Sequence, residues 1–119
     1  MIIRRDSVGA FDFGGLSVRD YTAGLDRSSS FAVIDVPPAT SHARSWSKRS
    51  DKYYYVISGA IEFMDASGAH GLTAGDVCFV PQGEWFAYRN CSGVPSVILL
   101  FHTPSFDLDS EVFEEPLED

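Results

Sequence analysis

A chain of 119 residues, 45% of them hydrophobic, is long enough for one folded domain but too short for two. No run of about 18 apolar residues occurs, so the sequence predicts no membrane-spanning helix. Seven acids and no base lie in residues 107–119, and the remaining ten acids and nine bases nearly balance. Because no basic surface is expected to neutralise phosphates, nucleic acid and membranes are not predicted partners.

These features divide the chain into one folded domain at 1–106 and an acidic tail at 107–119, which we expect to be solvated. Cys78 and Cys91 are too few for a disulfide framework and lack metal-ligand spacing. The N-terminal residues contain no apolar segment typical of a secretion signal. We therefore predict a cytoplasmic protein with reduced thiols.

The N-terminal half contains two expected strands. Residues 1–30 are weakly patterned, although 16–21 alternate like an edge or half-buried strand. A stronger strand is expected at 31–36, where Pro37 and Pro38 end it. Residues 39–51 are polar and are expected to form turns. No segment has a sustained helical period, apart from a possible turn or two near 110–115.

The C-terminal half alternates short apolar runs with turn residues. Gly59 is expected to turn the chain with a backbone conformation that a side chain would resist. The predicted strands are at 52–58, 60–64, 69–72, 77–80, 85–88 and 96–102. Strands at this spacing indicate an all-β sandwich or barrel.

Two motifs in this region resemble those of the cupin superfamily. Its second motif is Gly-x5-Pro-x-Gly-x2-His-x3-Asn, and Phe86 stands at the histidine position among the matching residues Gly75, Pro81, Gly83 and Asn90. In its first motif, anchored on Gly59, the glutamate position is Lys52, and the histidine positions fall on Ser45 and Ser47 or on Trp46 and Lys48. The resemblance covers about residues 31–106. It implies an all-β fold, a cupin-type antiparallel β-barrel of the jelly-roll or double-stranded β-helix kind.

The usual cupin site holds a divalent metal through three imidazoles and a carboxylate. Lys52 and Phe86 occupy two of these positions, and neither an ammonium nor a phenyl ring has a free lone pair. His42 enters the first motif only if the loop before Lys52 is longer than usual. We therefore predict no metal and no cofactor.

Strand alternation predicts which side chains enter the barrel. If Lys52 points inward, so does Tyr54, and Phe86 and Tyr88 face them. Arg44 and Trp46 are expected at the mouth. Catalytic candidates are Lys52, Tyr54 and His42; ligand-binding candidates are Arg44, Trp46, Phe86, Tyr88 and His102.

Lys52 is the central candidate. A lysine in an aromatic cavity has a lowered pKa and can act as a base, a Schiff-base nucleophile or a cation for a carboxylate or enolate. The alternatives are that it points to water or pairs with Asp51, Glu62 or Asp76. Tyr54 either donates a hydrogen bond to an oxyanion or only packs.

The resulting hypothesis is a metal-independent cupin that binds a small carbonyl, carboxylate or aromatic metabolite. Isomerisation, epimerisation, cyclisation or lyase chemistry needs only acid–base groups. The alternatives are a non-catalytic binding or sensor module and a purely structural dimer. A homodimer is expected, with the N-terminal segment as the strand that crosses over.

Overall fold

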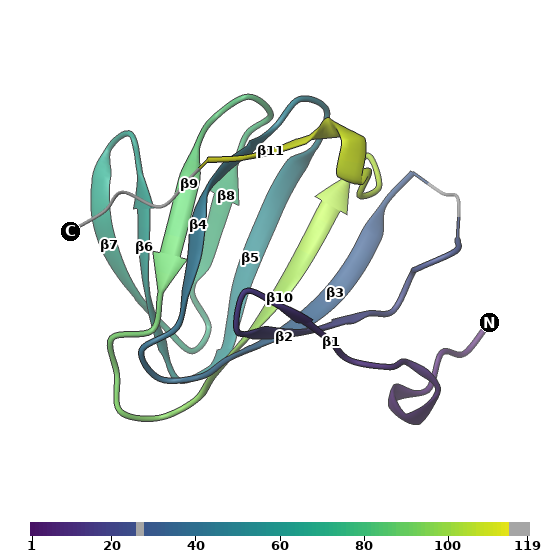
Figure 1. The fold of residues 1–119 in the computed structure, drawn as a ribbon, viewed down its shortest axis with the longest axis horizontal. Helices are drawn as coiled ribbons and strands as arrows, with labels where there is room; N and C mark the ends of the chain where they lie inside the picture. Colours follow the sequence, from purple (N-terminus) through teal and green to yellow (C-terminus); the bar gives the residue numbers. More distant parts are fainter. Residues whose placement is uncertain (26–27, 115–119) are drawn as a thin grey trace.

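In the computed structural model, which describes residues 1–25 and 28–114, two antiparallel sheets face each other in a jelly-roll arrangement (Figure 1). The six-stranded sheet has the order β1 (Phe11–Phe13), β2 (Leu16–Asp20), β3 (Ser30–Val36), β10 (Ser96–Thr103), β5 (Asp51–Ser58) and β8 (Val77–Val80). The five-stranded sheet has the order β11 (Glu111–Phe113), β4 (Ser41–Ser47), β9 (Phe86–Arg89), β6 (Ala60–Asp65) and β7 (Gly68–Thr73). The fold class predicted from the sequence is confirmed.

Helical structure is confined to short turns. The described residues form two 3-10 turns, η1 (Arg5–Ser7) and η2 (Leu108–Ser110). In this part of the chain, no helix is long and apolar enough to cross a membrane.

The core follows from period-2 alternation along the strands. Burial alternates strictly along β10, and the same pattern sends Tyr54 and Val56 of β5 inward. Each fully buried large apolar side chain contributes about 1.5–3 kcal/mol. The packed cluster comprises Leu16, Ile34, Val36, Tyr54, Val56, Ile61, Phe63, Val80, Phe86, Tyr88, Ile98 and Leu100.

Gly59 makes the tight turn between β5 and β6, as the sequence predicted. Its φ is +81°, a conformation that side chains disfavour, and a Cβ there would lie 2.9 Å from the Ser96 Cα. The close approach lets the Ser96 hydroxyl accept from the Ala60 N–H at 3.0 Å and donate to the Ala60 carbonyl at 2.8 Å.

The expectation that residues 39–51 form only turns is wrong, because β4 lies within them. This strand has no alternating apolar residues to reveal it. Instead, small polar residues face inward: Ser45 and Ser47 are buried. The Ser45 hydroxyl donates to the Ala43 carbonyl at 2.9 Å.

The two ends of the described chain both pack against the body. β2 pairs with β3 of the same chain, whereas the sequence suggested that this segment crosses to a partner. At the other end, β11 pairs with β4, with Glu111 opposite Ser47. Residues 111–113 therefore form a strand at the edge of the five-stranded sheet, and residues 115–119 of the expected tail lie outside the described part.

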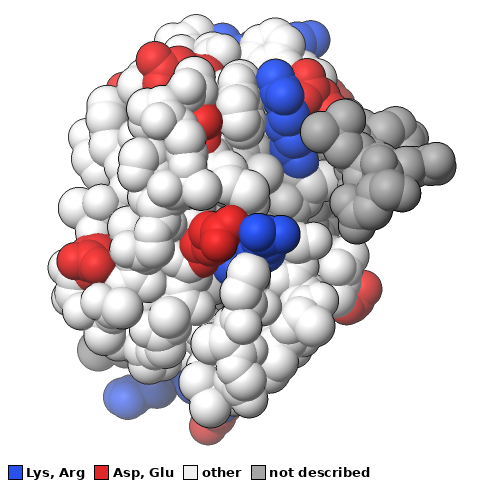
Figure 2. Space-filling view, turned by 90° about the vertical axis from the view of Figure 1, so that its left-hand side faces the viewer, with Lys and Arg blue, Asp and Glu red and all other residues white. Residues whose placement is uncertain are grey.

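Charge is sparse on the side of the molecule that carries β6 and β7. Much of this face is uncharged, and acidic side chains lie beside some of the basic ones (Figure 2). Arg89 of β9 and Glu62 of β6 form such a pair, at 2.8 Å.

Candidate functional site

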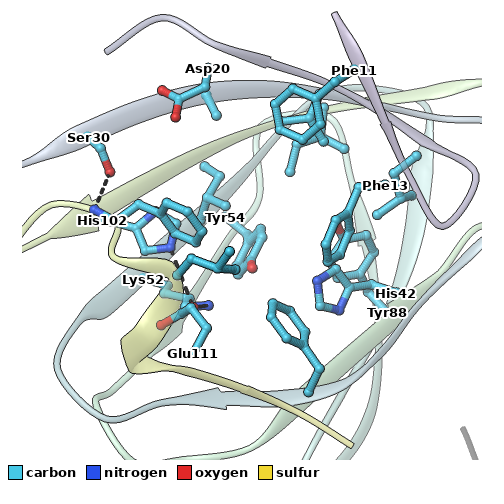
Figure 3. Close-up of a pocket in the computed structure, with 18 residues that line it drawn as sticks. Phe11, Phe13, Asp20, Ser30, His42, Lys52, Tyr54, Tyr88, His102 and Glu111 are labelled. Atoms are coloured by element: carbon cyan, nitrogen blue, oxygen red, sulfur yellow. Dashed lines mark hydrogen bonds and ion pairs between the residues drawn. The ribbon is translucent and has the colours of Figure 1, made fainter. Parts of the chain in front are cut away.

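A largely apolar cavity of about 290 Å³ opens between the two sheets (Figure 3). Five parts of the fold meet there: the β1–β2 hairpin, the neighbouring strands β3, β10 and β5 of the same sheet, β4, β9 and the segment from Phe106 to Phe113. Its lining consists of Phe11, Phe13, Leu16, Val18, Asp20, Ser30, Ala32, Ile34, His42, Lys52, Tyr54, Tyr88, Leu100, His102, Phe106, Leu108, Glu111 and Phe113. An apolar cavity with a few convergent polar groups is typical of a small-molecule site.

Lys52 points into this cavity from the start of β5. Tyr54 follows on the same face, because the intervening residue Tyr53 points outward. Lys52 pairs with Glu111 of β11, and the two side chains are only 5% and 2% exposed. Neither solvent nor any of the three acids considered from the sequence is its partner.

Both members of this ion pair have shifted pKa values. Burial lowers the pKa of Lys52, and the Glu111 carboxylate partly offsets this effect. Burial would raise the pKa of Glu111, but the neighbouring His102 and Lys52 outweigh it and lower the value to about 2. Glu111 is therefore a carboxylate at neutral pH, and it compensates the charge of Lys52.

His102 of β10 completes what we call the ion-pair end of the cavity, formed by Lys52, His102 and Glu111. The His102 Nε2 lies 3.9 Å from the Glu111 Oε1, beyond hydrogen-bonding distance. Burial lowers the pKa of His102. Among the described residues, neither His102 Nε2 nor the second oxygen, Glu111 Oε2, has a hydrogen-bond partner, although both atoms are buried.

His42 lies on the opposite side of the cavity, next to an irregularity in β4 (Figure 3). His42 pairs with Tyr88 and Ser45 pairs with Phe86, so β4 has one more residue than β9 between these pairs. Such a bulge removes a carbonyl from the regular ladder. The His42 Nδ1 lies 2.6 Å from the Ala43 carbonyl oxygen, which can only accept, so Nδ1 carries the proton.

Aromatic rings surround His42 and keep it neutral. Its ring stacks on Tyr88 with centroids 5.0 Å apart, and Phe13, Phe86 and Phe113 lie within 6.2 Å. Burial lowers the pKa of His42 to about 4. A neutral imidazole protonated at Nδ1 has its lone pair on Nε2, so Nε2 is the nitrogen that can accept a proton.

Two phenols lie beside this imidazole. Burial raises the pKa of both Tyr54 and Tyr88, so both hydroxyls are protonated at neutral pH. Their ring centroids are 5.5 Å apart. The Tyr88 hydroxyl is buried and has no hydrogen-bond partner within the described residues. We call His42, Tyr54 and Tyr88 the imidazole–phenol end.

Three residues predicted to bind ligand do not line the cavity. The bulge turns Arg44 away, and it lies 2.6 Å from Glu114 and over the Trp85 ring at 4.0 Å. Trp46 alternates with the buried Ser45 and Ser47 and so faces the other side of β4. Phe86 lies beneath the cavity, fully buried, with its ring 4.8 Å from the Lys52 Nζ.

Sequence reasoning missed Glu111 and the cover formed by the N-terminal hairpin. Phe11, Phe13 and Asp20 line the cavity from β1 and β2. Glu111 carried no distinguishing signal, because it is one of seven acids in residues 107–119. Only the pairing of β11 with β4 singles it out.

Comparisons with known proteins agree with this architecture. Residues 32–102 match the family model of the cupin domain. The chain belongs to the cupin family. A search of curated proteins gave no significant match.

Several solved cupins share the fold at low sequence identity. Pac13 of Streptomyces, described as a nucleoside dehydratase, is 21% identical with a TM-score of 0.85, covering 99% of this chain and 93% of Pac13. A predicted oxalate decarboxylase of Thermotoga maritima is 19% identical with a TM-score of 0.79, covering 87% of this chain and 99% of its own. A sugar phosphate isomerase of Silicibacter pomeroyi is 18% identical with a TM-score of 0.77, covering 99% and 97%.

The metal that many cupins hold does not fit the side chains of this cavity. Lys52 and Phe86, at two of the ligand positions, offer an ammonium and a phenyl ring. Ser45 donates its hydroxyl to the backbone. Within residues 1–25 and 28–114, no three His, Cys, Asp or Glu side chains are grouped closely enough to hold a metal ion.

Proposed function

We propose that this cupin binds a small hydroxylated molecule of about nucleoside size and removes water from it by acid–base catalysis, without a metal. One observation carries the proposal: an imidazole with a free Nε2 and two protonated phenols share one end of an apolar cavity. Dehydration belongs to the lyase chemistry that the sequence suggested.

The groups suit elimination next to a carbonyl. The His42 Nε2 takes the proton from the carbon beside the carbonyl, and the C–H electrons form the new double bond as the C–O bond of the hydroxyl breaks. The imidazolium returns the proton to the departing oxygen, which leaves as water. Tyr54 and Tyr88 remain protonated and donate hydrogen bonds to the carbonyl oxygen as negative charge develops on it.

One of the structural neighbours, Pac13, supports the choice of a nucleoside-sized substrate. Pac13 structures with uridine include variants in which one histidine or one of two tyrosines is replaced. The replaced histidine has the same residue number as His42. The two replaced tyrosines are as far apart in sequence as Tyr54 and Tyr88.

The test is to incubate the protein with uridine and with carbonyl-bearing oxidised uridines in D₂O. We expect the carbonyl-bearing uridines to lose one water by mass spectrometry and to exchange deuterium at the acidic carbon by NMR, whereas uridine itself, which has no carbonyl on its ribose, should bind without reacting. Tyr88→Phe should slow both reactions, whereas Tyr53→Phe, on the outward face of β5, should leave them unchanged. Equal rates in the two variants would contradict the proposal.

A non-catalytic binding module is the second candidate. The pKa of about 4 makes His42 a weak proton acceptor at neutral pH, which favours binding over catalysis. In that case calorimetry would detect uridine binding while no carbonyl-bearing uridine loses water or exchanges deuterium.

We also propose that two copies associate through the outward face of β5 and β8. Tyr53 pairs with Phe79 and Tyr55 with Val77 across these strands, and all four side chains are exposed. Contiguous exposed apolar surface of this kind marks an interaction site. Light scattering should report a dimer, and Phe79→Lys should shift it to monomer; a wild-type monomer would exclude this interface.

A further inference from the structure

Three buried polar atoms of the cavity have no hydrogen-bond partner among the described residues: Tyr88 Oη, His102 Nε2 and Glu111 Oε2. Leaving such an atom unpaired costs about 1–3 kcal/mol, and more when the group is charged. The imidazole–phenol end contains the first atom. The other two belong to the ion-pair end, which the proposed chemistry does not use.

The charges of the ion-pair end determine what can bind there. Lys52 is the one lysine or arginine among the residues that line the cavity, and Glu111 already neutralises it. Asp20 also lines the cavity and lies close enough to influence His102 electrostatically. With one cation against two carboxylates, this end offers no free positive charge to a phosphate or carboxylate.

Glu111 Oε2 is an ionised acceptor and therefore requires a donor. Carboxylates bind ribose hydroxyls in this way in many nucleotide-binding proteins. A hydroxyl or N–H of a ligand would satisfy Oε2 without breaking the pair between Lys52 and Oε1. An anionic group would instead face Oε2 at close range inside a poorly hydrated cavity.

We propose that the ion-pair end is a recognition subsite for the uncharged, hydrogen-bond-donating part of the ligand, with Glu111 Oε2 as its acceptor. This inference rests on the proposed function and adds to it a substrate class: nucleosides bind and their phosphates are rejected. Lys52 is then a partner that holds Glu111 ionised and in place, and it is not the cation that binds the substrate.

Calorimetry with uridine and with its 3′- and 5′-monophosphates tests the selectivity. The wild-type protein should bind uridine about tenfold or more tightly than either phosphate, as expected for one hydrogen bond to a charged group. Glu111→Gln keeps the shape, removes the acceptor charge and leaves Lys52 uncompensated. In this variant the preference for uridine should fall about tenfold or reverse.

Glu114→Gln is the matched control. It removes one negative charge from the same segment, but Glu114 pairs with Arg44 outside the cavity. The selectivity of this variant should equal that of the wild type. Equal binding of uridine and its phosphates to the wild type, or an unchanged ratio in Glu111→Gln, would overturn the inference.

A fragment pair separates failure of this inference from failure of the proposed function. Benzyl alcohol and benzoate are similar in size and differ in charge, and NMR titration measures both. A wild-type preference for benzyl alcohol that Glu111→Gln reverses supports the subsite even if no uridine compound binds, which would reject only the nucleoside proposal. Benzoate binding as tightly as benzyl alcohol to the wild type would overturn the subsite.

Discussion

The two ends of the cavity both consist largely of buried side chains but differ in charge. At the imidazole–phenol end, burial lowers the pKa of His42 to about 4, and the group remains neutral. At the ion-pair end, Lys52 compensates the Glu111 carboxylate, and the pKa of Glu111 falls to about 2 instead of rising. A compensating partner therefore decides whether a buried group keeps its charge.

The two ends of the cavity can therefore have different roles in the proposed function. His42 Nε2 has a free lone pair and can exchange a proton, whereas Lys52 is engaged with Glu111 and is not a free base. The catalytic role suggested for Lys52 by its sequence position therefore passes to His42 in our proposal. The ion-pair end is left to bind and orient the ligand.

Of the substitutions proposed here, removing one member of the ion pair between Lys52 and Glu111 should reduce the stability of the protein most. Lys52→Met leaves Glu111 as an uncompensated buried carboxylate, and the free energy of unfolding should fall by about 3–5 kcal/mol. Urea denaturation measures this loss. The double variant Lys52→Met/Glu111→Met should recover most of it, because no buried charge remains. A single variant as stable as the wild type would show that the pair is not buried.

Lowering the pH should reduce the free energy of unfolding, because the buried histidines resist protonation in the folded protein. The folded-state pKa of His42 lies below its ordinary value of 6.5, so the unfolded chain binds more protons at acidic pH. The stabilisation is fully present above pH 6.5 and is lost as the pH falls to about 4, by roughly 3 kcal/mol. His102 acts in the same direction, and Glu111 adds a further loss between pH 4.5 and 2.

Urea denaturation across this pH range would isolate the contribution of His42. In His42→Gln, the free energy of unfolding should depend less on pH between 6.5 and 4. The further loss of stability below pH 4.5, which comes from Glu111, should remain. An equal slope in the wild type and this variant would mean that His42 is exposed to solvent.

At the imidazole–phenol end, His42→Gln should lower turnover of the proposed reaction about 100-fold, with little change in Kd. Steady-state kinetics and calorimetry separate the two quantities. His70→Gln is the control, because His70 lies outside the cavity, 3.2 Å from Asp65 in the β6–β7 hairpin. A parallel loss of binding and turnover would assign His42 to ligand binding instead.

Substitution of Arg44, which lies at neither end of the cavity, should have the smallest effect on stability and ligand affinity. Its pair with Glu114 is exposed, with side-chain exposures of 42% and 41%. Arg44→Gln should therefore cost about 1 kcal/mol or less and leave the affinity for ligand unchanged. A large loss of affinity would place Arg44 at the cavity, as the sequence first suggested.

The strands that consist of apolar runs were predictable. Short runs rich in Val, Ile, Tyr and Phe marked β3, β5 and β10, and the glycine and proline landmarks placed the turns. The period of two placed Lys52 and Tyr54 on the same face of their strand, but that this face points inward was suggested only by the resemblance to the cupin motif. The same reasoning correctly placed Tyr88 in the cavity.

The polar parts of the site were not predictable in this way. β4 has serines where a core strand normally has apolar residues, and its bulge reverses the expected direction of Arg44. The partner of Lys52 lies 59 residues further along the chain, and local sequence carries no information on that pairing. Such contacts depend on the register of strands in three dimensions.

The position of Glu111 in the chain also sets an order of events during synthesis. Of the strands that the structure describes, β11 leaves the ribosome last, after all ten others. Until then β4 has a free edge and Lys52 has no counter-ion, while β1–β10 can already pair. A nascent chain can therefore acquire its core first, and the ligand site that we propose is complete only after β11 has been translated.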